Sequence, residues 1–176
     1  MVGQDWGNEA AFLGQSGRDD PSETNKLLKE LLESAGLQIS LPSGIPHRDE
    51  LFFTNAILCL KPDRDQKLPR STWLNNCGQH FLAPQIKLVR PKLVICLGEC
   101  AYNSVLRTFG IPRRHFREAV ESKEAIVLPT GTPILAAYHC SPNFREQRRP
   151  LVVQRQDWQR IGAFVERLRG QPDSAA

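Results

Sequence analysis

Three polar residues of types that can do chemistry stand in or shortly after short apolar stretches of this sequence. Asp5 lies in "GQDWG", Asn55 ends "FFTN", and His139 begins "HCSPNFR". A carboxylate can stabilise a developing positive charge, and an amide can donate one hydrogen bond while it accepts another. Each residue also has a structural interpretation: Asp5 as the cap of a helix or turn, Asn55 as a turn residue, and His139 as a satisfied strand-end histidine. The residues alone leave both interpretations open.

Apolar runs that alternate with helical patterns predict the fold. Strands alternating with helices indicate a three-layer α/β/α sandwich around a short, mainly parallel sheet. In such sheets ligands bind beyond the carboxyl ends of the strands, where the three polar residues stand. We predict one domain over 1–169 and a disordered tail over 170–176, with a first strand that is nearly absent before Gly3. The other strands are predicted at 51–60, 92–98, 125–129 and 133–139.

The first predicted helix carries signals at both of its ends. Asp20 is a suitable N-cap, Pro21 fits the first helical position, and Glu23 completes a capping box. Gly36 is a natural stop after the leucine-rich face of this helix.

Three later helices are predicted, at 71–90, 99–110 and 152–169. Pro84 implies a kink or break within the first of them, because proline lacks the backbone N–H that a helix interior needs. The apolar face of that helix is formed by Leu74, Cys77, Phe81, Leu82, Ile86 and Val89.

Composition excludes a membrane-spanning protein and leaves nucleic acid open as a partner. The chain has 176 residues, 40% hydrophobic and 24% charged, which is ordinary for one soluble globular domain. No apolar run approaches the roughly 20 residues that a membrane-spanning helix needs, and no signal peptide opens the chain. The net charge of +4 permits nucleic acid without requiring it. We expect a cytoplasmic monomer without disulfides.

Four motifs in this order resemble the uracil-DNA glycosylase superfamily: Gly-Gln-Asp, Thr-Asn-Ala, a Leu-Gly after the next strand, and His-x-Ser-Pro. The layout is closest to the iron–sulfur type, and the resemblance runs from Gly3 to about Leu168. It implies hydrolysis of the N-glycosidic bond of uracil, or a related deaminated base, in DNA during base-excision repair. DNA is then the partner, and the target base leaves the stack at a cost of roughly a few kcal/mol.

The resemblance also implies roles for the three polar residues. Asp5 orients the attacking water, Asn55 reads the base, and His139 donates a hydrogen bond to uracil O2. Two departures from the classical pattern occur. Trp6 stands where the first motif has a proline, and Cys140 replaces the proline of the last motif.

Further contacts follow from the same resemblance. Gly3 and Gln4 belong to the substrate-binding loop, Phe12 stacks on the flipped base, and Ser141 helps to grip the phosphates. DNA contacts are expected from Asn143, Phe144 and Arg145, with Phe144 as a wedge in the vacated stack. A basic cluster near these residues is a candidate for holding the DNA backbone: Arg145, Arg148, Arg149 and Arg155.

Two cysteines match part of a metal site of the iron–sulfur members. Cys59 follows the Thr-Asn motif and Cys77 lies in the next helix, where the last two of four cluster ligands belong. The other two ligands lie upstream of the first motif in those members, and two thiolates do not complete a 4Fe-4S cluster. We therefore expect this chain to bind no metal and no stable cluster, and to be poorly stable. Two explanations compete: either the cluster was lost and Cys59 and Cys77 are inert core residues, or the reading frame starts further upstream and the missing ligands lie there. The nearly absent first strand favours the second explanation, because a parallel sheet without it would expose unpaired edges.

Two other functions compete with this interpretation. One is a catalytically silent relative of the same fold that binds DNA or nucleotides. The other is an unrelated doubly wound domain that binds a mononucleotide. Against the latter, the chain has no G-x-G-x-x-G or P-loop motif.

Overall fold

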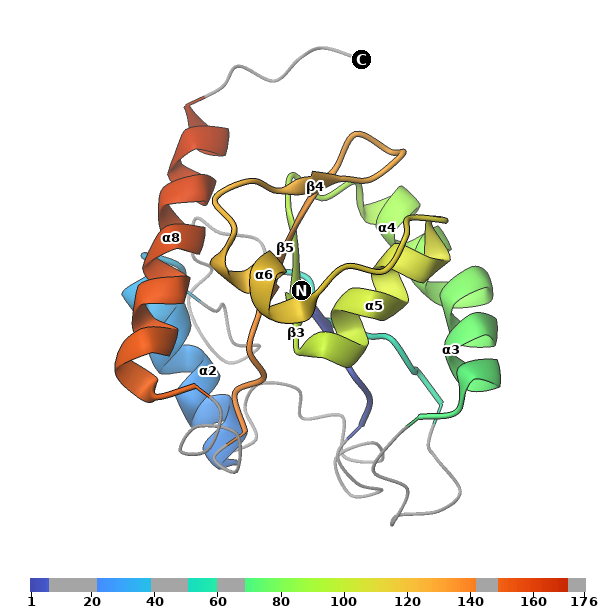
Figure 1. The fold of residues 1–176 in the computed structure, drawn as a ribbon, viewed down its shortest axis with the longest axis horizontal. Coiled ribbons are helices and arrows are strands. Elements are labelled where there is room, and N and C mark those ends of the chain that lie inside the picture. Colours follow the sequence, from blue (N-terminus) through green and yellow to red (C-terminus); the bar gives the residue numbers. More distant parts are fainter. Residues whose placement is uncertain (7–21, 39–50, 60–68, 142–148, 171–176) are drawn as a thin grey trace.

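The protein folds as helices on both faces of one sheet (Figure 1). Its structure, a computed structural model, describes residues 1–6, 22–38, 51–59, 69–141 and 149–170. The sheet has five strands in the order β2-β1-β3-β5-β4. This α/β architecture with a mainly parallel sheet confirms the fold class predicted from the sequence.

Parallel pairing brings the carboxyl ends of four strands, β1, β2, β3 and β5, to one edge of the sheet. β1 pairs parallel with β2 and β3, and β3 pairs parallel with β5, whereas β4 runs antiparallel along β5. β1 is only two residues long, yet it lies between two neighbours and buries Val2. The strands are β1 (Val2–Gly3), β2 (Thr54–Asn55), β3 (Val94–Leu97), β4 (Ile126–Val127) and β5 (Pro133–Ala137).

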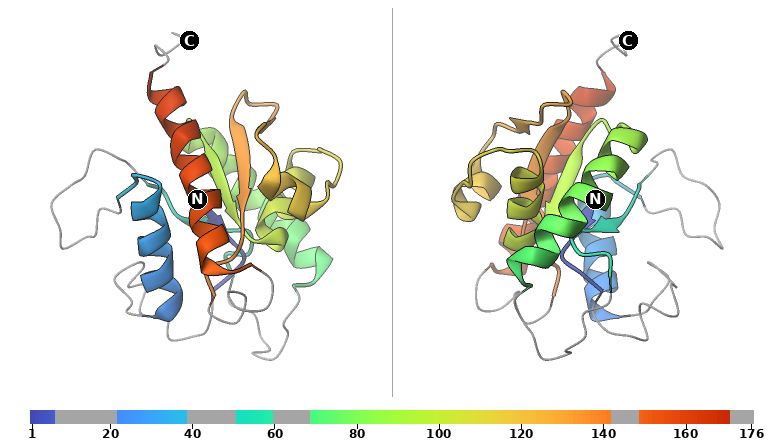
Figure 2. Two further views of the ribbon diagram at one scale, coloured as in Figure 1. Left: turned by 60° about the vertical axis from the view of Figure 1, so that its left-hand side comes forward. Right: turned by 90° about the vertical axis from the view of Figure 1, so that its right-hand side faces the viewer.

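β3 is the centre of the core because its side chains alternate between two layers. Val94 and Cys96 face one apolar cluster, and Ile95 and Leu97 face the other. Figure 2 shows α2 and α8 on one face of the sheet and α3, α4 and α5 on the other. The helical segments are α2 (Glu23–Ser34), α3 (Ser71–Cys77), the π-helix η2 (Gly78–Leu82), α4 (Ala83–Val89), α5 (Glu99–Thr108), α6 (Phe116–Glu121) and α8 (Leu151–Arg169).

The strand predicted over 51–60 is wrong in its length and burial. β2 contains only Thr54–Asn55, and Phe52 is 47% exposed. The physical reason lies in the partner strand, because two residues of β1 offer only a two-residue ladder. β2 also forms the edge of the sheet, so it lacks a second neighbour.

The predicted start of the first helix is also wrong. Helix α2 begins at Glu23, and the Ser22 hydroxyl caps it by accepting a hydrogen bond from the Asn25 N–H at 3.3 Å. Ser22 therefore takes the role expected of Asp20, because its hydroxyl reaches an N–H that would otherwise lack an intrahelical partner. The predicted stop is confirmed, since Gly36 follows the helix with φ 69°.

Pro84 interrupts the helical segment after residue 71 without ending it. The π-helix η2 stands directly before α4, whose first turn contains Pro84, so the wider turn accommodates the missing N–H. The wider turn also rotates the helix faces. Phe81 and Val89, expected on the apolar face, are 53% and 40% exposed.

Helix α6 was not predicted, because its six residues are too few for a periodic pattern. The predicted C-terminal helix is confirmed by α8, which buries Trp158 and Ile161. Within the described ranges, none of the helices combines the length and apolarity needed to cross a bilayer.

Close packing between α2 and α8 generates a prediction about stability. A Cβ atom on Gly162 would lie 2.3 Å from the Ala35 carbonyl oxygen at the end of α2. Gly162→Ala should therefore separate the helices and lower the free energy of unfolding by about 1–3 kcal/mol. This loss should outweigh the gain of about 1 kcal/mol in helix propensity, and urea denaturation measures it.

Gly170→Ala is the matched control, because the nearest atom to its new Cβ would be the Glu166 carbonyl oxygen at 3.7 Å. Equal unfolding free energies for the Gly162 and Gly170 variants would contradict the tight crossing.

Candidate active site

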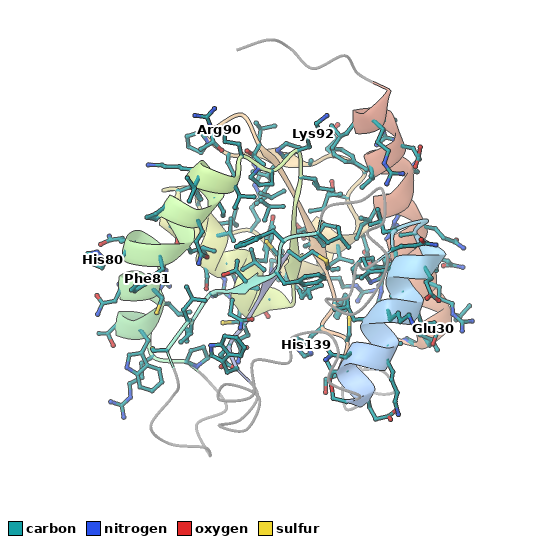
Figure 3. All side chains as sticks on the ribbon, turned by 180° about the vertical axis from the view of Figure 1, so that it is seen from behind. Glu30, His80, Phe81, Arg90, Lys92 and His139 are labelled. Carbon is teal, nitrogen blue, oxygen red and sulfur yellow. The ribbon has the colours of Figure 1, made fainter. Side chains whose placement is uncertain are left out.

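The carboxyl ends of β1, β2, β3 and β5 carry the polar residues singled out by the sequence. Gly3 and Asn55 end β1 and β2, Gly98 follows β3, and His139 stands shortly after β5. Figure 3 shows His139 at this edge of the molecule, opposite Arg90 and Lys92. The fold therefore brings residues from distant parts of the chain to one edge of the sheet, where ligands bind in parallel sheets.

Asn55 and Gly3 are register partners in neighbouring strands. The Gly3 carbonyl accepts a hydrogen bond from the Ala56 N–H at 2.8 Å, which fixes the backbone beside the amide. A Cβ atom on Gly3 would lie 2.5 Å from Asn55 Oδ1. Only glycine leaves room for this side chain, so the backbone of β1 determines where the Asn55 amide lies.

A hydrogen bond donated to α4 supports the same strand on its outer side. The Thr54 hydroxyl donates to Gln85 Oε1 at 2.7 Å. Because Thr54 precedes Asn55, this bond ties the edge strand to a helix immediately beside the candidate base reader. The edge position of β2 is thus compensated by a side-chain contact.

The loop after β1 holds Asp5 in a partly buried position. Gln4 Nε2 donates to Asp5 Oδ2 at 3.1 Å, which orients the carboxylate. Trp6 Nε1 donates to the Leu58 carbonyl at 2.9 Å, and the Ile57 N–H donates to the Gln4 carbonyl at 2.9 Å. The loop after β1 therefore runs along the segment that follows β2. It places the Asp5 carboxylate at the same edge of the sheet as Asn55.

A backbone hydrogen bond sets the proton position on His139. The Ser141 N–H donates to His139 Nδ1 at 3.1 Å, so Nδ1 acts as an acceptor. In the neutral imidazole the proton is then on Nε2, which becomes the donor nitrogen of the ring. A ring in this state can donate to an oxygen atom that gains negative charge.

Gly98 lies beside that side chain at the end of β3. Its φ of 93° favours glycine, and a Cβ atom there would lie 3.4 Å from the His139 Cβ atom. The Gly98 N–H also donates to the Ala137 carbonyl at 2.7 Å, which continues the β3–β5 ladder up to the site. The sequence identified Gly98 only as a strand end, because its proximity to His139 depends on the tertiary fold.

The basic cluster predicted near the last motif is not a uniform DNA-facing surface. Arg149 is only 9% exposed and pairs with Asp157, and Arg155 pairs with Glu30 on α2. The prediction that Arg149 holds the DNA backbone is therefore wrong, because its guanidinium is buried in an ion pair. The sequence did contain a signal of this buried ion pair: Asp157 is an acidic residue on the apolar face of an amphipathic helix, where a carboxylate needs a cationic partner.

Several predicted contacts lie outside the described residues. They are Phe12, Asn143, Phe144, Arg145 and Arg148. Their roles stay predictions.

Two of the cysteines are neighbours. Burial raises the pKa of the Cys59 thiol, and the adjacent Cys77 raises it further through its negative charge and a hydrogen bond. Burial also raises the pKa of Cys96 to about 12, which is consistent with a core residue. Within the described ranges, no three His, Cys, Asp or Glu side chains gather as metal ligands. The Cys59–Cys77 pair thus supplies two thiols, which do not complete the four-thiolate ligation of a 4Fe-4S cluster.

Comparison with known proteins identifies related sequences. The family model described as the uracil DNA glycosylase superfamily matches residues 3–162. A type-4 uracil-DNA glycosylase of Archaeoglobus fulgidus is 29% identical over 116 residues, covering 60% of this chain and 52% of the relative. A type-5 uracil-DNA glycosylase of Pyrobaculum aerophilum is 29% identical over 111 residues, covering 63% and 45% respectively. The chain thus spans about half the length of these relatives.

Gly3→Ala tests the contact between β1 and the Asn55 amide. Optimal contacts between non-bonded heavy atoms lie near 3.5–4.0 Å, so a methyl group 2.5 Å from Oδ1 should displace the amide by roughly 1 Å. We expect the rest of the sheet to stay paired. A crystal structure of the variant, with side-chain amide NMR signals, measures the displacement. An Asn55 side chain that keeps its position in the variant would contradict the proposed constraint.

Proposed function

The chain belongs to the uracil DNA glycosylase superfamily, and from that premise we propose that it hydrolyses the N-glycosidic bond of uracil, or of a related deaminated base, in DNA. The reaction is the first step of base-excision repair. The observation that carries the proposal is the Asn55 amide held against Gly3, at the same sheet edge as Asp5 and His139. Such a fixed amide is suited to recognising a planar base.

Asn55 is proposed to distinguish uracil from cytosine. Its NH₂ group donates to uracil O4, and its carbonyl accepts from uracil N3–H. Cytosine presents the opposite pattern at both positions. The discrimination requires that the amide does not rotate, because a rotated amide would suit cytosine instead. Packing against Gly3 supplies this restraint.

Asp5 is proposed to act at the sugar. Bond cleavage develops positive charge on the deoxyribose, and a carboxylate can stabilise that charge and orient the attacking water. The hydrogen bond from Gln4 fixes the carboxylate before substrate arrives. Preorganisation of this kind lowers the reorganisation needed in the transition state.

His139 is proposed to act at the departing base. Uracil leaves as an anion, and negative charge develops on O2 as the glycosidic bond breaks. A neutral ring that accepts from the Ser141 N–H at Nδ1 donates from Nε2, which suits this oxygen. The side chain therefore acts on charge that appears only in the transition state.

Uracil-containing DNA is the proposed partner, bound by a monomer in the cytoplasm with the target base flipped out of the stack. The net charge of +4 permits contact with phosphates. A catalytically silent relative that only binds DNA is the alternative.

A cleavage assay with labelled DNA tests the proposal. The substrates carry uracil opposite guanine, uracil opposite adenine, or uracil in a single strand. Formation of abasic sites in any of them supports the proposal. Binding of these DNAs without abasic product would refute it and favour the silent relative.

Asn55→Asp should reduce the preference for uracil over cytosine while the fold is kept. A carboxylate cannot donate to uracil O4, whereas it can accept a hydrogen bond from the amino group of cytosine. Excision rates on uracil- and cytosine-containing DNA measure the preference. Asn76→Asp, in an exposed part of α3, is the matched control. An unchanged preference in the Asn55 variant would show that this residue does not read the base.

Asp5→Asn and His139→Ala should each slow the chemical step far more than they weaken DNA binding. Both groups act on charge that appears in the transition state, and loss of one such stabiliser costs about 10²–10³ in rate. Single-turnover kinetics separates chemistry from binding. His80→Ala, at an exposed histidine of η2, is the control for the second variant. A rate within roughly threefold of wild type would exclude the role of the residue concerned.

A further inference from the structure

Arg149 is a buried cation with three charged hydrogen bonds. Its Nε and Nη2 atoms donate to the two carboxylate oxygens of Asp157 at 2.9 and 2.8 Å, and Nη1 donates to Glu121 Oε1 at 2.9 Å. These bonds join α8 to α6. The backbone of Arg149 is also held, because its carbonyl accepts from Gln154 Nε2 at 2.8 Å. Both the main chain and the side chain of this residue are therefore fixed.

The same guanidinium covers an aromatic ring beside the candidate active site. The Arg149 Cζ atom lies 5.3 Å from the centroid of the Tyr138 ring, within cation–π range. Tyr138 immediately precedes His139. Its ring also packs edge-on against Phe116 of α6, with centroids 5.1 Å apart. The residue before the histidine is thus held between a cation and a second ring.

Stability alone is a weak reason to bury this ion pair. Replacing a buried ion pair with well-packed apolar residues is often neutral or stabilising, whereas a bidentate guanidinium fixes geometry in two directions. The contact with Tyr138 transmits that geometry to the chain one residue before His139. A change in the Nε2 position by about 1 Å is enough to slow a reaction about 10²-fold.

We propose that Arg149 is a positioning residue: through Tyr138 it sets where His139 presents its Nε2 proton. The inference rests on the proposed excision of uracil. Arg149 does not contact the substrate in this mechanism. It acts by fixing the backbone from Tyr138 to Ser141, where the Ser141 N–H in turn holds the histidine ring.

Conservative substitution of Arg149 should leave the protein folded, which makes the proposal testable. Asp157 also accepts a hydrogen bond from Arg160, so its carboxylate keeps a cationic partner when Arg149 is changed. Arg149→Lys retains the positive charge but loses the planar fork that spans Asp157 and Glu121. Tyr138→Leu removes the ring, and Tyr138→Phe keeps it.

Single-turnover excision of uracil from DNA, measured with saturating enzyme, is the first experiment. We expect Arg149→Lys and Tyr138→Leu to slow the chemical step about 10- to 100-fold. Tyr138→Phe should stay within about threefold of wild type, because the ring face remains. Arg117→Lys is the matched control: it changes an exposed arginine that pairs with the same Glu121 but does not cover Tyr138. Wild-type rates in Arg149→Lys would overturn the proposal.

A double-mutant cycle separates positioning from general destabilisation. In the His139→Ala background, Arg149→Lys should change the rate by less than about twofold, because the group that it positions is gone. If Arg149→Lys costs the same factor with and without His139, its role is structural only and the proposal is wrong.

Nitrogen-15 NMR of the His139 ring gives a readout that does not depend on activity. Arg149→Lys should shift the Nδ1 and Nε2 resonances, whereas Arg117→Lys should leave them in place. Should the wild-type protein leave uracil in DNA, the proposed function fails and these resonances alone decide the positioning role. Unchanged His139 resonances in Arg149→Lys would overturn it.

Discussion

The pairing of the short strand β1 with β2 on one side and, through Val2, with β3 on the other is the constraint on which the candidate site depends. Because β1 lies between β2 and β3, its register determines that Gly3 stands beside Asn55. A shift of one residue would turn Val2, which is buried in the core, toward the other face of the sheet. Burial of the Val2 side chain therefore fixes the register of β1, and that register places Gly3 beside the Asn55 side chain. The two residues of β1 are enough for this role because both neighbouring strands are held independently. A hydrogen bond ties β2 to α4, and the ladder with β5 holds β3.

Glycines lie beside the candidate functional side chains at two strand ends. Gly3 leaves room for the Asn55 amide, and Gly98 adopts a positive φ directly beside the His139 side chain. In both cases the volume that a Cβ would occupy lies next to a polar side chain from the neighbouring segment. The site is thus formed by close approach of backbone and side chain, which limits the rotation of both groups. A rigid amide and a ring with a defined proton position are what base discrimination requires.

The sequence predicted those parts of the fold that depend on local pattern. The fully buried strand β3 and the amphipathic helix α8 follow from the runs "LVICLG" and "DWQRIGAF", and both elements are present. The lengths of β1 and β2 could not be predicted, because a ladder is as long as the shorter partner. The π-turn before Pro84 changed which side chains are buried, and periodicity assumes a regular helix. Arg149 was misread because its carboxylate partners lie on two other elements.

The candidate site and the neighbouring helices α6 and α8 hold their polar side chains in different ways. At the candidate site, neutral donors orient the functional groups: the Gln4 amide holds Asp5, and the Ser141 N–H holds His139. The cations and carboxylates of α6 and α8 instead neutralise one another around Arg149. The Gln4 donor orients the Asp5 carboxylate without adding a charge of its own. Paired charges behind the site can then hold the histidine segment without adding a competing field at the reacting bond. Separating the two tasks in this way suits the proposed reaction, which would develop opposite charges on the sugar and the base.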